Sequence, residues 1–493
     1  MRQGGRKSLV VRVGGEGKGQ GRMQKSSKII LVTIAASGAI ALSVGKSQAD
    51  PGGFALRQSP YFQGTSFAGV AAGGASISSM FWNPATMTQA GRGLTIEGDG
   101  TLDMPRANIT PSLATSPTGV DITGLGSSGD LFDKATFIPS AYAVYGLNNN
   151  LSFGVGLNSP FGLKTQPNPL WSGMFYAQES NIKDINATPS VAWKVNNWLS
   201  IGAGAQIQYF KIRLDSAFPG SGTTGAFPFL APLGPDQLDL RGDAWGFGYT
   251  LGATITPTPW TTIGVGYRSE VDQKVSGNIF RPAFTAPVIV PPFGLIPVRV
   301  PAADGVNFDA TVPLPGSVTA SVRQKITNSL TVLGTVEWTN WSRLNTVPIA
   351  TASAGLIPGV PTQLSFGWRD GWLFSGGLEY MCSRGLALRT GIGWEQSPIT
   401  DQTRSPRLPD NGRLWVSGGA SYNWNQYLSL DFAYTHIFVQ DAPINISPGV
   451  GNPVFDPRLG VFIGNSSGSV DIVSVGLRYR FVPVVAPAVV RKG

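Results

Sequence analysis

Apolar and small polar residues alternate one by one along most of this chain, and that period of two constrains the fold more than any other feature. From Ser200 to Tyr209, apolar residues at odd positions alternate with serine, glycine and glutamine at even positions. Similar alternation occurs from Leu386 to Trp394 and from Val473 to Phe481. A period of two is typical of β-strands whose two faces meet different surroundings. The sequence therefore predicts an all-β protein.

The polar face of these segments is unlike that of a soluble β-sandwich. It consists mainly of glycine, serine and glutamine with an occasional arginine. Charged residues make up 13% of the chain, whereas a typical soluble domain has about 25%. A mean hydropathy of +0.05 excludes a bundle of transmembrane helices, because each helix would need about 20 consecutive apolar residues. A transmembrane β-barrel, whose strands face lipid on one side and a polar lumen on the other, fits this composition.

About fourteen alternating segments occur between residues 93 and 481, and the connections between them alternate in length. Asn148–Asn150 and Asn196-Asn197 are short connections, whereas 213–242 and 276–315 are long. Bacterial outer-membrane barrels have an even number of strands, short periplasmic turns and long external loops. We therefore predict an antiparallel barrel of about fourteen strands over residues 93–481, in the outer membrane of a Gram-negative bacterium.

The first 49 residues have the features of a leader. Lys25 and Lys28 precede an apolar run from Ile29 to Val44, and Ser47-Gln48-Ala49 follows it. This pattern predicts a secretory signal peptide over residues 23–49 rather than a buried N-terminal helix. Residues 1–22 do not belong to such a signal, and we interpret them as a disordered extension or a misplaced gene start.

Two further segments fall outside the alternating pattern. Residues 50–92 are rich in glycine, alanine and serine and end with an aromatic pair. A barrel of about fourteen strands needs either a water channel or a filling. We therefore expect residues 50–92 to form a hatch inside the lumen, the alternative being a periplasmic linker. The proline- and valine-rich residues 482–493 are predicted to be a periplasmic tail.

Charge and residue counts exclude several functions. The net charge of +9 arises in residues 1–49, which hold nine basic residues and one acidic residue. Subtracting these from the 37 basic and 28 acidic residues of the chain leaves 28 and 27, so nothing indicates a nucleic-acid partner. A single cysteine and a single histidine exclude a disulfide framework, a classical zinc site and a Cys–His nucleophile pair. The sequence predicts no enzyme activity and no cofactor.

Several short motifs, in order along the chain, resemble the FadL-type outer-membrane transporters of long-chain fatty acids and other hydrophobic compounds. The motifs are Asn83-Pro84-Ala85-Thr86-Met87, Ser159-Pro160-Phe161-Gly162, Tyr267-Arg268-Ser269-Glu270, Trp338-Thr339-Asn340-Trp341-Ser342, Ser397-Pro398-Ile399 and Leu408-Pro409-Asp410. The resemblance extends from about Gly52 to Phe481. It implies a fourteen-stranded barrel closed by an N-terminal hatch, with substrate leaving through a gap in the wall at a kinked third strand.

Two of these motifs are candidate parts of a transport path. Asn83, Pro84 and Ala85 are the candidate gating residues of the hatch, because an Asn side chain before proline commonly holds a turn. Pro160, Phe161 and Gly162 follow the third predicted strand, where proline removes a ladder donor, so we expect a break in pairing there. The alternative is that Pro160 simply begins the second external loop.

The candidate substrate-binding residues lie in the external loops and near them. Loops 213–242 and 276–315 are apolar enough to predict contact with an apolar molecule, although they could instead pack together as a lid. The resemblance suggests capture of substrate on these loops and carboxylate binding by basic residues nearby, which do not match the family residue for residue. The candidates are Phe227, Phe229, Leu230, Phe293 and Leu295 in the loops, and the basic residues Lys211, Arg213 and Arg343.

These observations predict a channel for passive uptake of long-chain fatty acids or similar hydrophobic molecules. Substrate would be captured on the external loops, pass the hatch and leave sideways at the third strand. The alternatives are an aromatic-hydrocarbon channel of the same fold, a structural or adhesive barrel, and a general diffusion porin. The expected partners are the substrate, outer-membrane lipid and lipopolysaccharide, and the barrel-assembly machinery, and we expect a monomer.

Overall fold

The computed structural model describes residues 55–117, 119–132, 135–218, 237–290, 294–351, 362–449 and 451–481. For 284–290 and 294–298 it describes the backbone alone. The predicted leader (1–49) and tail (482–493) lie outside the described residues and stay predictions. Among the described residues, no helix combines the length and the apolar character needed to cross a membrane.

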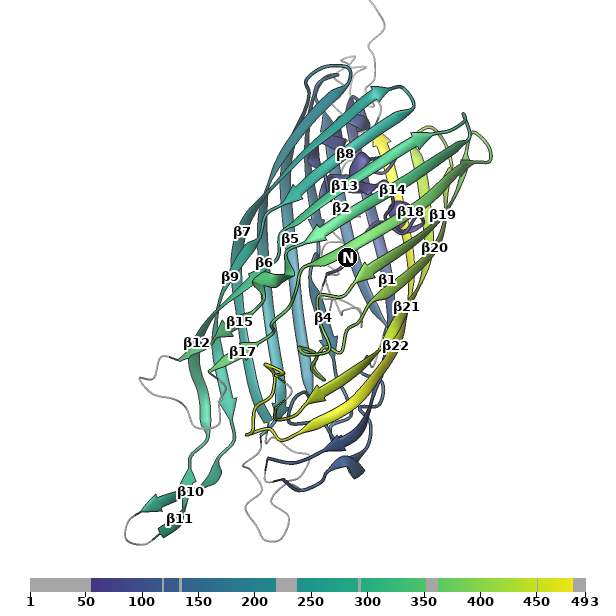
Figure 1. Cartoon of the computed structure of the whole chain (residues 1–493). Coiled ribbons are helices and arrows are strands. Elements are labelled where there is room, and N and C mark those ends of the chain that lie inside the picture. Colours follow the sequence, from purple (N-terminus) through teal and green to yellow (C-terminus); the bar gives the residue numbers. More distant parts are fainter. Residues whose placement is uncertain are drawn as a thin grey trace, which may run out of the picture. The chain divides into compact units, whose positions relative to one another are not determined.

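The wall of the barrel is a single antiparallel sheet that closes on itself. Its strands are β1 (Gly93–Ala114), β2 (Thr136–Gly146), β3 (Leu151–Asn158), β4 (Gly162–Thr165), β5 (Glu179–Lys194), β6 (Leu199–Ala217), β7 (Gln237–Thr258), β8 (Thr261–Arg268), β9 (Val271–Arg281), β12 (Ala303–Leu314), β13 (Ser317–Lys325), β14 (Leu330–Thr339), β18 (Gly371–Met381), β19 (Leu386–Gln396), β20 (Arg413–Asn423), β21 (Leu428–Ile446) and β22 (Phe462–Phe481). β1 pairs with β22 from Leu94 to Ala114 and closes the barrel (Figure 1).

Three of the wall strands are interrupted, and this accounts for the strand number. β3 and β4 both pair with β5, β8 and β9 both pair with β7, and β12 and β13 pair with β9 and β8 in turn. Counted in this way, the barrel has the predicted fourteen strands. The predicted fold class is therefore confirmed.

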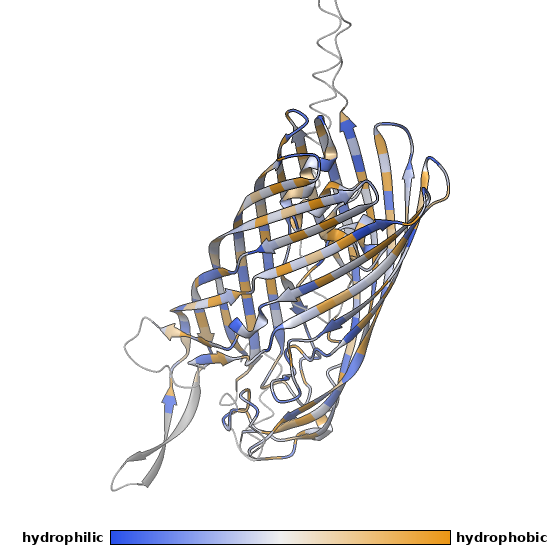
Figure 2. Cartoon of the chain, turned by 45° about the horizontal axis from the view of Figure 1, so that its top comes forward, coloured by the Kyte–Doolittle hydropathy of each residue, from blue (hydrophilic) through white to orange (hydrophobic). Residues whose placement is uncertain are grey.

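The two faces of the wall differ as the alternation predicts. Hydrophobic and hydrophilic positions follow one another along each strand (Figure 2). The outward positions are large and exposed, as at Trp193, Phe247 and Trp394, while inward positions such as Thr435 and Ser474 are fully buried. An outward apolar band facing lipid and a polar interior are the arrangement of outer-membrane barrels.

The hatch lies inside the barrel, as Figure 1 shows for the first coils of the chain. It consists of α2 (Pro60–Gln63) and the 3₁₀-helices η1 (Val70–Ala72), η2 (Ile77–Phe81) and η3 (Pro84–Ala90). Its backbone approaches the wall so closely that a Cβ at Gly252 would overlap Asn83, and one at Gly266 would overlap the carbonyl group of Trp82. Glycine at these two wall positions is therefore required for the hatch to fit.

The end of the barrel with the long loops is covered by packed loops. Trp171, fully buried, donates from Nε1 to the carbonyl oxygen of Ala177 at 3.0 Å and stacks edge-on against Phe462. The short elements of these loops are η4 (Thr123–Leu125), η5 (Trp341–Arg343), β15 (Thr346–Pro348), β16 (Ala350–Thr351) and β17 (Gln363–Ser365). A separate hairpin of β10 (Phe284–Val290) and β11 (Gly294–Val300) projects beyond this end (Figure 1).

Candidate functional site

A cavity of about 550 Å³ lies beneath the packed loops. Strands of the wall and loops that fold into the lumen both contribute to it. Most of its lining side chains are apolar, among them Leu163, Ile182, Phe210, Ile212, Leu214, Leu238, Val312, Leu344, Val347, Phe366, Trp368, Ile399 and Leu408. A concave, mainly apolar cavity of this size is typical of a site for a hydrophobic small molecule.

The two basic side chains that line this cavity are both engaged by protein groups. Arg407 donates to the carbonyl oxygens of Tyr176 at 2.9 Å, Glu179 at 2.8 Å and Asp215 at 3.1 Å. Burial lowers the pKa of the Arg407 guanidinium to about 10, so this group stays charged at neutral pH. Arg458 is paired with Asp456, with 2.6 Å between Nη2 and Oδ2.

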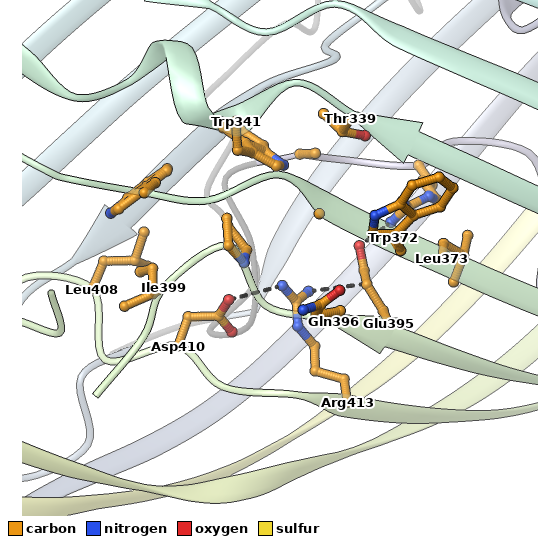
Figure 3. Close-up of a pocket in the computed structure, with 15 residues that line it drawn as sticks. Thr339, Trp341, Trp372, Leu373, Glu395, Gln396, Ile399, Leu408, Asp410 and Arg413 are labelled. Carbon is orange, nitrogen blue, oxygen red and sulfur yellow. Dashed lines mark hydrogen bonds and ion pairs between the residues drawn. The ribbon is translucent and has the colours of Figure 1, made fainter. Parts of the chain in front are cut away.

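A layer of charged residues lies beside this cavity and lines a small pocket that shares Trp368, Ile399 and Leu408 with it; Figure 3 shows Arg413 between Asp410 and Glu395 in this layer. Arg413 is paired with Asp410 at 3.1 Å and with Glu395 at 3.4 Å. Glu395 also accepts from Arg57 at 2.9 Å, at the beginning of the described hatch, and Arg57 reaches Glu337 at 2.8 Å. The pocket among these residues has a volume of about 20 Å³, which is room for about one water molecule. The charged layer therefore closes this side of the cavity in this conformation.

The third wall strand is interrupted at the residues that the sequence singled out. The ladder between β2 and β3 ends at Ala141 and Leu157, and in the described part of the chain β4 pairs with β5 alone. The chain bends towards the hatch at Pro160, whose carbonyl oxygen accepts from the backbone N–H of Leu56 at 2.8 Å. Pro160 is not merely the start of a loop, because β4 resumes the ladder with β5 after it.

The interrupted segment is bound to the hatch and to the cavity. The side chain of Gln58 accepts from the backbone N–H of Ser159 at 3.2 Å and donates to its carbonyl oxygen at 2.5 Å. Phe161 lies edge-on to Trp341, 6.0 Å between ring centroids, and Trp341 packs in the same way on Trp368 of the cavity at 5.4 Å. A movement of the hatch would therefore displace the interrupted segment and, through Phe161 and Trp341, the side chains that line the cavity.

The candidate gating residues hold the hatch together. Asn83 caps η3 by accepting from the backbone N–H of Ala85 at 3.0 Å. Its Nδ2 donates to the carbonyl oxygens of Ala71 at 2.7 Å and Ala253 at 2.9 Å. Pro84 is the first residue of η3, where a missing N–H costs nothing. Their part in gating stays a prediction.

The three predicted carboxylate-binding residues do not line the cavity. Lys211 and Arg213 lie on β6 opposite in parity to the cavity residues Phe210 and Ile212. Arg213 is paired with Asp215 at 2.7 Å, and it also reaches Glu179 and Asp239. The alternation from Ile201 to Tyr209 already places Lys211 on the lipid-facing side, and this signal could have excluded it.

The remaining candidates have other positions. Arg343, on η5, is paired with Glu270 at 3.1 Å and with Asp272 at 2.9 Å. Phe227, Phe229, Leu230 and Phe293 lie outside the described residues, and of Leu295 only the backbone, on β11, is described. Sequence reasoning missed Arg407, because no local pattern shows that its loop folds back into the lumen.

Comparison with known proteins gives a consistent result. Residues 42–481 match the family model described as outer membrane protein transport protein (OMPP1/FadL/TodX). A long-chain fatty acid transport protein of Escherichia coli K12 is 24% identical over 433 residues, covering 83% of this chain and 93% of the relative. A putative outer membrane protein of Neisseria meningitidis is 28% identical over 443 residues, covering 84% and 91%.

Solved structures share the fold. A FadL homologue from Pseudomonas aeruginosa superposes with a TM-score of 0.72 at 21% identity, covering 87% of this chain and 100% of the homologue. The toluene transporter TbuX of Ralstonia pickettii superposes with a TM-score of 0.58 at 19% identity, covering 86% and 98%.

Proposed function

The chain belongs to the OMPP1/FadL/TodX family of outer membrane transport proteins, and from this premise we propose how it carries its substrate. It is an outer-membrane channel for hydrophobic compounds. Substrate enters the cavity beneath the packed loops, stays there beside the charged layer, and leaves through the gap between β2 and β4 when the hatch shifts. The apolar cavity next to an interrupted wall strand is the observation that carries this proposal.

The hydrogen bonds of the hatch support its role as the moving part. A break in the wall of a barrel exposes backbone groups to lipid, which is costly unless other partners take them. Here Leu56 and Gln58 of the hatch bind Pro160 and Ser159 at the break. The hydrogen bonds from Leu56 and Gln58 thus satisfy the backbone groups at the break and also keep it closed. Releasing them would open a path to the membrane.

We further propose that substrates are recognised through their apolar part. Among the described residues, both cations that line the cavity are bound by protein acceptors, Arg407 by three carbonyl oxygens and Arg458 by Asp456. A substrate carboxylate would have to displace one of these partners. Long-chain fatty acids would then bind through their hydrocarbon chains. Neutral and aromatic hydrocarbons are equally good candidate substrates.

Uptake and binding of matched ligands test both proposals. Cells that carry the protein should take up radiolabelled oleate and methyl oleate faster than cells that lack it, and the purified barrel should bind the two with similar affinity. Equal uptake by cells with and without the protein would disprove the transport function. A preference for oleate of more than about tenfold, which is about 1.4 kcal/mol, would instead show that a cation binds the carboxylate.

A further inference from the structure

The wall has a second break, between β7 and β9. β7 pairs with β9 from Asp239 to Asp243 and with β8 from Thr250 to Thr258. Between these ladders, the described chain has no strand pairing for Ala244–Gly248 on this side. β9 keeps its ladder with β12 from Val271 onward, so the break lies between β7 and β9 alone.

Side chains close this break in place of backbone hydrogen bonds. Val271 and Gln273, 3% and 0% exposed, point inward from β9 and lie against the glycines of β7. A Cβ at Gly246 would lie 2.6 Å from Nε2 of Gln273, and one at Gly248 would lie 2.9 Å from Cγ2 of Val271. The space between the two strands is therefore filled by two side chains of β9, and glycine on β7 makes room for them.

The amide of Gln273 is poorly satisfied in this position. Its Nε2 and Oε1 are both buried, and neither has a hydrogen-bond partner among the described residues. A buried polar group without a partner destabilises the arrangement that buries it. The closed arrangement therefore carries an energetic cost that an opening to water or to a ligand would relieve.

The break separates an aromatic outer surface from the cavity. Trp245, Phe247 and Tyr249 alternate outward along β7, and Phe247 is 70% exposed. Aromatic side chains at this position are typical of the girdle at the membrane interface. On the inside, Val312 lines the cavity and is the direct ladder partner of Gln273. The closing side chain of Gln273 is thus one strand away from a residue that lines the cavity.

The end of the break towards β8 is held by the motif that the sequence singled out at residues 267–270. Ser269 accepts from the backbone N–H of Tyr249 through its hydroxyl at 2.9 Å. Arg268 donates to the carbonyl oxygen of Phe81 at 3.0 Å and lies 4.0 Å from the centre of its ring. Ser269 therefore ends the ladder between β7 and β8, and Arg268 binds the hatch on the inner face of the wall.

We propose that the break between β7 and β9 is a side entrance, through which a hydrophobic molecule at the outer membrane interface passes into the cavity, with Val271 and Gln273 as its gate. This inference rests on the proposed transport function.

A reversible crosslink across the break tests the entrance. In a Cys382→Ser background, Gly246→Cys with Val271→Cys places two thiols in the contact that a Cβ at Gly246 would make with Val271, close enough for a disulfide. Oxidation should slow uptake of radiolabelled oleate by about tenfold, or about 1.4 kcal/mol in the barrier, and reduction should restore it. The matched control, Leu388→Cys with Ala420→Cys, joins directly opposite residues of the closed ladder between β19 and β20 and should leave uptake unchanged.

Two substitutions at Gln273 give an independent test that needs no crosslink. Gln273→Ala shortens the gate and should speed uptake, whereas Gln273→Leu fills it without a buried amide and should slow uptake. Equal uptake by both variants, or full crosslinking with undiminished uptake, would overturn the entrance while leaving the transport function standing. No uptake by the unmodified protein would instead count against the transport function itself.

Discussion

The amide group of Asn83 joins three parts of the molecule that are distant in sequence. It caps η3, binds η1 through the carbonyl oxygen of Ala71, and binds the wall through that of Ala253. The bonds to Ala85 and Ala71 are buried and the bond to Ala253 is partly buried, so most of this side chain's partners lie away from water. At this scale the hatch is positioned by a few polar side chains with several partners each.

Replacing Asn83 by alanine should impair transport more than assembly. The variant loses a cap and removes the donor to the buried carbonyl group of Ala71, at a cost of about 1–3 kcal/mol that falls on the hatch. Radiolabelled oleate uptake should fall while the amount of heat-resistant, inserted barrel stays normal. Thr88→Ala, which removes partly buried hydrogen bonds of 3.0 Å to Ala85 and to Ser200 but leaves the Asn83 bonds in place, is the control and should change neither. Wild-type uptake by the Asn83 variant would refute the gating role.

Tyr61 fastens the other end of the hatch. Its hydroxyl donates to Glu379 at 2.7 Å, and the guanidinium of Arg389 lies 3.6 Å from the centre of its ring. Tyr61→Phe keeps the ring contact and removes a hydrogen bond to a charged group, worth about 1.5–3 kcal/mol. We expect more frequent channel openings in planar bilayers. Tyr176→Phe, which loses a hydroxyl bond of 2.6 Å to Gly460 in the packed loops, should not change them, and identical traces for the two variants would contradict a latch at Tyr61.

At the scale of elements, two of the interrupted strands mark the places where we propose that the wall opens. β3 and β4 are separated by a segment bound to the hatch, and β8 and β9 by a segment that ends the ladder to β7. An uninterrupted barrel strand has all its backbone groups paired and gives no lateral path. The two breaks are therefore the places where we propose that a molecule can cross the wall.

Restoring the third strand should block exit without blocking binding. Pro160→Val with Gly162→Val supplies the missing donor and suits a pleated surface, so pairing with β2 beyond Ala141 is favoured. Uptake of radiolabelled oleate should fall by about tenfold, or about 1.4 kcal/mol in the barrier, while oleate binding to the purified barrel persists. Pro189→Val, which replaces a proline opposite Val155 in the closed ladder of β5, is the matched control. Undiminished uptake by the double variant would rule out this exit.

At the scale of the whole molecule, the sequence predicts the wall far better than the path through it. Strand number and the inward and outward faces follow from a period of two, because every residue of a barrel strand meets either lipid or lumen. Arg407 and Trp171 could not be placed in this way, since they lie in loops whose folding depends on contacts distant in sequence. The breaks illustrate both cases. Pro160 predicts the first break from the sequence. The second can be recognised only from the register of β7 and β9, which brings Gly246 next to Gln273.

Because the wall and the hatch are held by different contacts, the hatch can be removed while the wall is kept. Deleting Gly64–Met87 removes most of the hatch, yet the barrel is closed by the ladder between β1 and β22, so insertion and heat resistance should persist. A barrel of this width has space for a channel once it is empty. Ion conductance in planar bilayers should therefore rise well above that of the intact protein. The packed loops around Trp171 remain in the variant, and conductance that does not change would place the main barrier there and not in the hatch.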